Sequence, residues 1–279
     1  MSELLSILNT QLTLNIPDVN FLIKKYLYVS RARLIGWAQN RYQGYEVNVT
    51  DSSPSTSPDS VPMTVYEVVE GLPFEGEIGR GLLFRTNRGD LKSILHQSAG
   101  SEHAVIFVCG ARGGFGGPAT GMYARLAERL KLEGITSLRL DYRHPNVIPE
   151  CVLDMLAGIA MLKGTGHKPV ILVGHSFGGA VVVASGVASS HVKGVVCLSP
   201  QTYGAHLAGQ LSPKSLLVVH GKSDTRLPFS CGIQIHDWGQ EPKELVLYEG
   251  AEHRLEECGT ELEELLFQWI PKTLTSVDS

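Results

Sequence analysis

The amino-acid sequence predicts a protein of the α/β class, with one mostly parallel β-sheet and helices on both of its faces. From residue 63 onward, short apolar runs alternate with segments in which apolar residues recur at helical spacing. Short apolar strands separated by helices are typical of a parallel sheet that is covered on both sides. The 279 residues, of which 43% are hydrophobic, are enough for one large core.

The chain divides into three zones. Residues 1–46 contain an apolar stripe at helical spacing after Pro17 and Asp18, which favours a helix that begins there. Residues 47–62 are rich in serine and proline, a composition typical of a linker. Residues 63–279 hold the alternating strands and helices and form the predicted α/β domain.

The N-terminal zone is also basic. Residues 17–45 contain five basic side chains and one acidic side chain. A basic amphipathic helix can make weak contact with an anionic membrane surface. The alternative is that the apolar stripe packs on the main domain while the lysines face water, which is the usual role of such stripes.

The elements of the domain follow from the alternation. Strands are expected at residues 64–69, 81–85, 90–96, 104–109, 135–140, 170–173, 195–198, 216–219 and 244–248. Helices are expected around residues 123–130, 153–160, 180–188 and 262–269. Ligands bind at the carboxyl ends of the strands in such sheets, so the loops that follow the parallel strands are the places to search for a site.

Composition argues against several classes of protein. Lys and Arg number 24 against 28 Asp and Glu, and the resulting net charge of −4 argues against a dedicated nucleic-acid binder. The five cysteines are odd in number and lack CxxC spacing, which favours a reduced, cytoplasmic compartment. No signal peptide, membrane-spanning run or metal-ligand spacing is evident, so no metal is expected.

The strongest local signal is a G-x-S-x-G pattern formed by Gly174, Ser176 and Gly178. It follows the apolar run 170–173 and precedes the apolar segment 180–188, which is the strand–turn–helix context of a nucleophile elbow. Glycines are needed because flanking side chains would clash in so tight a turn. The pattern predicts that Ser176 is a nucleophile, with a tight structural turn as the alternative.

A nucleophilic serine needs a base that takes its proton and an acid that orients the base. His253 lies just after the strand predicted at 244–248, and we predict that it is the base. Asp224 lies a few residues after the strand predicted at 216–219, and we predict that it is the acid. The alternatives are an ordinary surface-loop histidine and an aspartate that caps a turn.

A glycine-rich stretch, residues 110–117, follows the strand predicted at 104–109. Glycines permit close backbone approach and exposed N–H groups, which an oxyanion hole requires. We predict that the amides of Ala111 and Phe177 donate to the oxyanion, with Arg112 as an alternate donor or a steering charge. The loop residues expected near the substrate are Arg112, Gly113 and Gly114. A phosphate-binding glycine loop is the rival interpretation, but the stretch lacks the G-K-[ST] ending.

Together these motifs resemble those of the α/β-hydrolase superfamily. The matching stretches are residues 110–114, 174–178, 220–224 and 250–253. The resemblance covers about residues 63–271 and implies an α/β-hydrolase fold with about eight strands and a triad of Ser176, Asp224 and His253. The sequence departs from the family at Cys109, where a histidine often precedes the glycine and supports the oxyanion loop.

The interval where other members insert a cap is short, residues 200–214, so the outline is similar to small lidless, dienelactone-hydrolase-like esterases and thioesterases. The resemblance implies a serine hydrolase that cleaves a carboxylic ester or thioester of a small-molecule acyl substrate and needs no cofactor. Two other functions stay open on the same fold. One is a non-catalytic protein that binds a ligand or partner, and the other is an acyltransferase.

Overall fold

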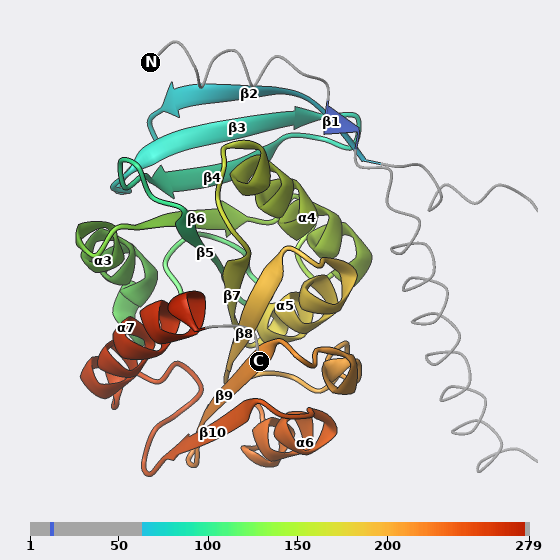
Figure 1. Cartoon of the computed structure of the whole chain (residues 1–279). Helices are drawn as coiled ribbons and strands as arrows, with labels where there is room; N and C mark the ends of the chain where they lie inside the picture. Colours follow the sequence, from blue (N-terminus) through green and yellow to red (C-terminus); the bar gives the residue numbers. More distant parts are fainter. Residues whose placement is uncertain (1–11, 14–62, 277–279) are drawn as a thin grey trace, which may run out of the picture.

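The computed structural model describes residues 12–13 and 63–276 of the chain, and these residues form a ten-stranded sheet (Figure 1). The strand order across the sheet is β1-β2-β3-β4-β6-β5-β7-β8-β9-β10. The strands are β1 (Leu12–Thr13), β2 (Thr64–Leu72), β3 (Arg80–Thr86), β4 (Leu91–His96), β5 (His103–Val108), β6 (Ile135–Asp141), β7 (Val170–His175), β8 (Val192–Leu198), β9 (Ser215–Gly221) and β10 (Lys243–Tyr248).

The sheet is mostly parallel, as predicted. Strands β6, β5, β7, β8, β9 and β10 pair in parallel with their neighbours, whereas β1 to β4 pair antiparallel and β4 joins β6 antiparallel. The central parallel strands consist almost entirely of buried apolar residues, because both of their faces are covered. The carboxyl ends of β5, β7, β9 and β10 therefore lie at one edge of the sheet.

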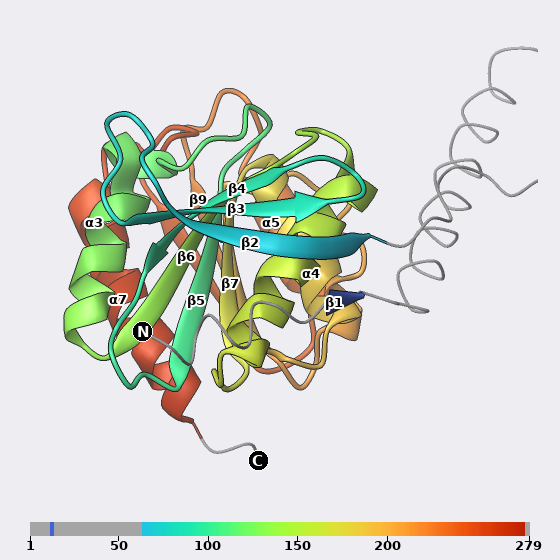
Figure 2. The same cartoon turned by 90° about the horizontal axis from the view of Figure 1, so that it is seen from above.

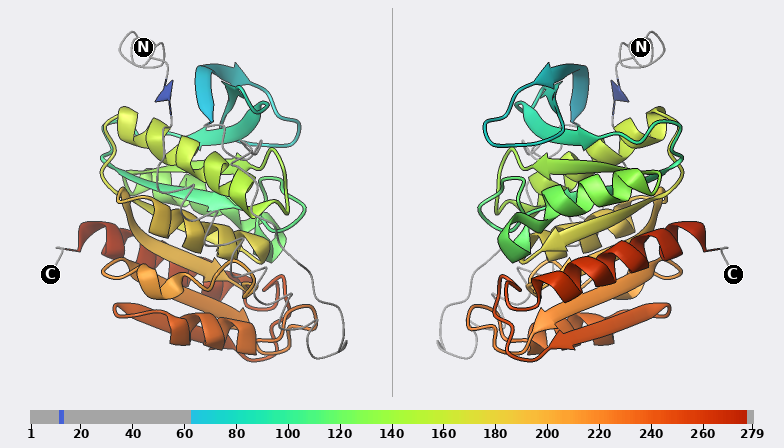
Figure 3. Two further views of the ribbon diagram at one scale, coloured as in Figure 1. Left: turned by 90° about the vertical axis from the view of Figure 1, so that its right-hand side faces the viewer. Right: turned by 90° about the vertical axis from the view of Figure 1, so that its left-hand side faces the viewer.

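Helices cover the sheet in two layers (Figures 2 and 3). One face carries α3 (Pro118–Leu132) and α7 (Gly259–Thr275), and the other carries α4 (Ile148–Gly164), α5 (Phe177–Ala188) and α6 (Ser230–Trp238). Helix α5 is apolar nearly all round because it packs against both the sheet and α4. Helix α7 buries Leu262, Leu266 and Trp269 in a single stripe and turns its glutamates outward.

The structure corrects the prediction in two places. Leu12–Thr13 is a short strand that pairs with β2, where no strand is predicted, and it precedes the helix predicted to begin at Pro17 and Asp18. Helix α6 is absent from the predicted elements because only Gly232 and Ile235 of its residues are buried, which leaves a weak apolar period. The rest of segment 1–46 and the predicted linker 47–62 lie outside the described residues, and the predicted membrane contact of residues 17–45 lies there too.

Other findings bear on the class of protein. All five cysteines are free, and four of them are buried. Within the described chain, no helix is long and apolar enough to cross a membrane. The connection from β8 to β9 contains only the short helix η2 (Ala208–Gln210), so no cap is inserted between these two strands.

Candidate active site

Ser176 lies on a sharp turn between β7 and α5. Its backbone has φ 57° and ψ −117°, a left-handed conformation that is strained for a residue with a side chain. A Cβ atom on Gly174 would lie 2.2 Å from the carbonyl oxygen of Gly178, and one on Gly178 would lie 2.4 Å from that of Cys109. The turn is therefore closed only with glycine at both positions, and it raises Ser176 above the end of β7.

Three side chains predicted from distant parts of the chain meet at this turn. The hydroxyl of Ser176 lies 3.0 Å from Nε2 of His253, and Nδ1 of His253 lies 2.7 Å from Oδ2 of Asp224. Asp224 is a carboxylate acceptor, so His253 donates from Nδ1 and its Nε2 is left to accept the proton of Ser176. His253 and Asp224 are only 7% and 9% exposed, so this chain of hydrogen bonds is shielded from water.

The carboxylate of Asp224 is held by four donors. Its Oδ1 accepts hydrogen bonds from the amides of Arg226 (2.9 Å) and Leu227 (2.8 Å), while Oδ2 accepts from His253 and from Nε2 of His220 (3.0 Å). Burial alone would raise the pKa of Asp224, but the hydrogen bonds from Leu227, His253 and Arg226 bring it below the ordinary value. Asp224 is therefore ionised at neutral pH and can stabilise a positive charge on His253.

His220 is a residue of this network that sequence reasoning missed. It is fully buried at the end of β9, and its Nε2 is also close to the carbonyl oxygen of Leu227 (3.1 Å). Both neighbours of Nε2 are acceptors, so the proton is on Nε2, and Nδ1 has no hydrogen-bond partner. Burial lowers the pKa of His220, which favours this neutral form. A polar residue at the end of an otherwise apolar strand, four positions before Asp224, is the signal that could have indicated it.

His175 supports the loop of His253 from the other side. Its Nε2 donates to the backbone oxygen of His253 at 2.9 Å, and the centres of the two rings are 5.0 Å apart. Burial lowers the pKa of His175 to about 4, so its ring is neutral at physiological pH. Its contact is with the backbone of His253, which leaves the hydroxyl of Ser176 to the ring of His253.

The glycine-rich loop after β5 faces Ser176 and is anchored by polar groups. The amide of Gly114 donates to Oδ1 of Asp141 at 2.6 Å, and Nδ2 of Asn146 donates to the backbone oxygen of Ala111 at 3.0 Å. Cys109, which stands where a histidine is common, accepts a hydrogen bond from the amide of Gly117 through its sulfur at 3.2 Å. The turn after β6 therefore supplies the main support of this loop.

A buried arginine supports the same loop from below. Arg139 on β6 donates to the backbone oxygen of Phe115 (3.3 Å), to Glu77 (2.6 Å) and, through Nε, to Nε2 of His96 (3.0 Å). His96 is then a neutral ring with its proton on Nδ1, and burial is the main cause of its lowered pKa. The guanidinium is fully buried but compensated by these acceptors.

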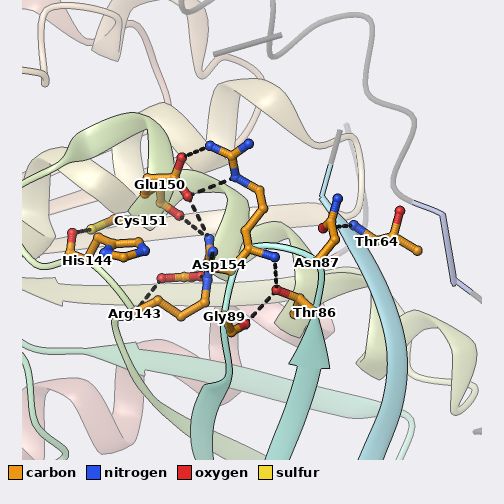
Figure 4. A network of polar contacts seen from close by, with 10 residues as sticks. Thr64, Thr86, Asn87, Gly89, Arg143, His144, Glu150, Cys151 and Asp154 are labelled. Atoms are coloured by element: carbon orange, nitrogen blue, oxygen red, sulfur yellow. Dashed lines mark hydrogen bonds and ion pairs between the residues drawn. The ribbon is translucent and has the colours of Figure 1, made fainter. Parts of the chain in front are cut away.

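Ion pairs connect the turn after β6 to helix α4 (Figure 4). The amide of Arg143 donates to Oδ2 of the fully buried Asp154 at 3.0 Å, and its Nε donates to the other carboxylate oxygen. Its Nη2 contacts Glu150 at 3.0 Å, and Glu150 also binds Arg88. These contacts hold the segment that carries Asp141 and Asn146.

A pocket of about 340 Å³ opens in front of Ser176. Its lining consists of Cys109, Gly110, Ala111, Arg112, Gly113, Gly116, Gly117, Pro118, His175, Ser176, Arg226, His253 and Arg254. Ser176 and His253 thus face the same space as the predicted oxyanion residue Ala111 and the predicted substrate-loop residues Arg112 and Gly113. The predicted substrate-loop residue Gly114 is not in the lining, and its amide donates to Asp141.

Phe177, the second predicted oxyanion donor, is not among the residues that line the pocket. Its side chain is buried edge-on against Tyr142, with the ring centres 5.9 Å apart. It is the first residue of α5, and the first amides of a helix have no acceptor within the helix. Its N–H is therefore available beside Ser176, in the partial positive field of the helix terminus.

Among the described residues, no group of three or more His, Cys, Asp and Glu side chains is arranged to hold a metal ion.

Comparison with known proteins identifies the fold. No protein-family model and no curated protein matches the chain. Among solved structures, dienelactone hydrolase from Anabaena variabilis matches with a TM-score of 0.60 and 20% identity over 70% of this chain and 97% of the other. Est1E from Butyrivibrio proteoclasticus matches with a TM-score of 0.61 and 15% identity, covering 70% and 99%. An α/β serine hydrolase homologue from Coxiella burnetii matches with a TM-score of 0.57 and 21% identity over 71% of this chain and 99% of the other.

These similarities cover nearly the full length of the matched chains, and at these identities they define the fold. The chain has the α/β-hydrolase fold, which confirms the predicted fold class.

Proposed function

We propose that the protein is a serine hydrolase that cleaves a carboxylic ester or thioester through an acyl-enzyme intermediate. The observation that supports this most directly is the hydrogen-bonded series Ser176–His253–Asp224, with the serine facing a pocket and strained into an elbow. Strain at a buried polar series is typical of a site that is organised for chemistry. The matched structures include a dienelactone hydrolase and Est1E, which is also known with ferulic acid bound.

In the first half of the reaction, Oγ of Ser176 attacks the acyl carbon while Nε2 of His253 takes the hydroxyl proton. The carbonyl oxygen becomes an oxyanion that accepts hydrogen bonds from the amides of Ala111 and Phe177, each worth roughly 10²–10³ in rate. His253, stabilised as a cation by Asp224, then gives the proton to the leaving oxygen or sulfur. The bond between the acyl carbon and that atom breaks, and the acyl group stays on Ser176.

In the second half, water takes the place of the leaving group. His253 removes a proton from water as its oxygen attacks the acyl carbon, and the same two amides hold the second oxyanion. The proton then returns from His253 to Oγ of Ser176 as the ester bond to the enzyme breaks. The carboxylic acid leaves, and the free enzyme is regenerated without a cofactor.

The test is labelling by a fluorophosphonate probe together with hydrolysis of p-nitrophenyl esters of graded chain length. We expect Ser176→Ala to lose labelling and to lose at least about 10³-fold in kcat. The matched control is Ser185→Ala on the following helix, whose buried hydroxyl has no hydrogen-bond partner, and it should retain both. Robust turnover by Ser176→Ala would refute the proposal, whereas ester formation in preference to hydrolysis with an added alcohol would identify an acyltransferase.

A further inference from the structure

Three arginines line the pocket in front of Ser176. Arg112 belongs to the glycine-rich loop, Arg226 follows Asp224 by two positions, and Arg254 is next to His253. They come from the loops after three different strands, β5, β9 and β10. All three side chains are largely exposed, so their charged ends are accessible to a molecule that enters the pocket.

No carboxylate balances these charges within the pocket. The lining contains no Asp or Glu among the described residues. The nearby acids are engaged elsewhere: Asp224 is buried and accepts from four donors, and Asp141 accepts from Gly114. Glu252 accepts from the amide (3.0 Å) and hydroxyl (3.1 Å) of Thr225. Glu256 forms an ion pair with Arg254 at 2.8 Å.

Arg112 and Arg226 form no ion pair with a described residue, and Arg254 has one partner outside the pocket lining. The pocket is therefore locally positive in a chain whose net charge is −4. Alongside burial, the charge of Arg254 helps to lower the pKa of His175, which lines the same pocket. Positive charge of this kind beside a reactive serine, with two of the three arginines free of an ion-pair partner among the described residues, raises the local concentration of anions.

From this arrangement we propose that the substrate is an ester or thioester that carries an anionic group, a carboxylate or a phosphate, which Arg112, Arg226 and Arg254 bind while its acyl carbon faces Ser176. The proposal rests on the serine hydrolase function proposed above and adds the class of substrate. The planar guanidinium presents paired N–H donors that match both carboxylate and phosphate oxygens, and these charge-assisted hydrogen bonds fix orientation as well as affinity.

The placement of the arginines also explains how binding would orient the reaction. Arg226 and Arg254 are each within two residues of a triad member, so an anion held there lies beside the reacting centre. Holding the remote end of the substrate in this way turns binding energy into correct alignment of the acyl carbon.

The experiment compares three esters of equal length, with background hydrolysis subtracted: p-nitrophenyl hexanoate, mono-p-nitrophenyl adipate, and the counterpart of the adipate in which a phosphonate replaces the carboxylate. We expect kcat/KM for one or both anionic esters to exceed that of the hexanoate by roughly 10- to 100-fold at low salt. The larger value between the two identifies the anion. The preference should shrink in about 0.5 M NaCl, because salt screens exposed charges.

A thioester pair tests the leaving-group side. Acetyl-coenzyme A carries phosphates on its thiol, whereas S-acetyl-N-acetylcysteamine is its neutral counterpart. If acetyl-coenzyme A is preferred over its neutral counterpart while the three p-nitrophenyl esters react equally, the bound anion lies on the leaving group. That result supports the proposal, with the anion on the thiol side of the substrate.

The variants Arg112→Gln, Arg226→Gln and Arg254→Gln should each reduce the anionic-to-neutral ratio of kcat/KM by roughly 3- to 10-fold. The matched control is Arg85→Gln, an exposed arginine on β3 that does not line the pocket, and it should leave the ratio unchanged. Equal kcat/KM for neutral and anionic substrates in both series would overturn the anion site while the Ser176-dependent hydrolase remains. If no ester is hydrolysed, the hydrolase proposal fails, and calorimetric titration of the protein with inorganic phosphate still tests the anion site. Phosphate binding that is lost in the Arg226→Gln, Arg254→Gln double variant would support the anion site. Absence of phosphate binding to the wild-type protein would overturn it.

Discussion

His220 and His253 donate hydrogen bonds to the same oxygen of Asp224, at 3.0 Å and 2.7 Å. Asp224, the proposed orienting acid, is thus shared between a histidine that reaches Ser176 and a second, fully buried histidine. Because His220 keeps its proton on Nε2, it acts as a fixed donor that sets the position of the carboxylate. His220 is therefore a positioning residue in our interpretation.

Replacement of His220 tests this role. We expect His220→Ala to lower kcat roughly 10- to 150-fold, the range that corresponds to one hydrogen bond to a charged group. The acid limb of the kcat/KM profile should move to higher pH, because Asp224 then concentrates more charge on the oxygen that faces His253. His220→Gln keeps an amide donor near the place of Nε2 and should recover most of the activity. A stability loss with an unmoved pH profile would show that His220 only fills space.

The support of the glycine-rich loop gives a second prediction. Asn146 has a positive φ of 72° and binds the backbone oxygen of Ala111, next to one of the proposed oxyanion donors. Asn146→Gly keeps that backbone conformation available and removes only the amide, so we expect kcat to fall roughly 3- to 10-fold with little change in KM. Asp141→Asn should act in the same direction, because its Oδ1 holds the amide of Gly114. A rise in KM with constant kcat would instead place these residues in substrate binding.

The elbow glycines give a third prediction. Gly178→Ala would place a Cβ 2.4 Å from the backbone oxygen of Cys109, and neither backbone can move without breaking β5 or α5. We expect a loss of at least about 3 kcal/mol in the free energy of unfolding, or failure to fold. Gly164→Ala at the end of α4 is the matched control, since nothing lies within 4 Å of the added methyl group. It should be neutral or stabilising by up to about 1 kcal/mol in urea unfolding.

The buried ion pair of Arg143 and Asp154 gives a fourth prediction (Figure 4). In Asp154→Ala, the nearly buried guanidinium of Arg143 keeps its ion pair with Glu150 but loses the one with Asp154. We expect the free energy of unfolding to fall by about 3–5 kcal/mol. Glu102→Gln is the control, because the ion pair of Glu102 with Lys168 has side chains about 60% exposed and is screened by water, so its loss should have little effect on stability. Equal effects of the two substitutions in urea unfolding would contradict this.

The sequence predicted the parts of the site that follow from strand ends and glycine patterns. Ser176, Asp224 and His253 each follow a parallel strand, and parallel strands end at one edge, so their convergence could be expected. Their catalytic roles stay a prediction. His220 could not be placed in the same way, because hydrophobic periodicity and composition do not show which carboxylate a single buried histidine contacts. The contact of Asn146 with Ala111 likewise depends on how two loops approach each other, which no local pattern encodes.

The last prediction concerns the pH dependence of stability. Five histidines have pKa values below the ordinary 6.5, with burial as the main cause, and for His175 the value is about 4. These histidines therefore bind more protons in the unfolded chain than in the folded chain between pH 6.5 and about 4, so their contribution to stability is full above pH 6.5 and falls as the pH drops through that window. For His175 alone the loss between pH 7.5 and pH 5 is about 2 kcal/mol.

Urea unfolding at these two pH values checks the sign and the size of this effect. Asp154 acts in the opposite sense, because burial raises its pKa to about 6 and the folded chain takes up a proton there as the pH falls. The contribution of His175 is therefore read from the difference between the wild-type protein and a His175 variant. His175→Gln retains a donor for the backbone oxygen of His253 but cannot take up a proton, and its loss of stability between the two pH values should be smaller than that of the wild-type protein by about 2 kcal/mol. Equal losses in both proteins would mean that His175 is protonated as easily when folded as when unfolded, and its ring would then be open to water rather than buried against the loop of His253.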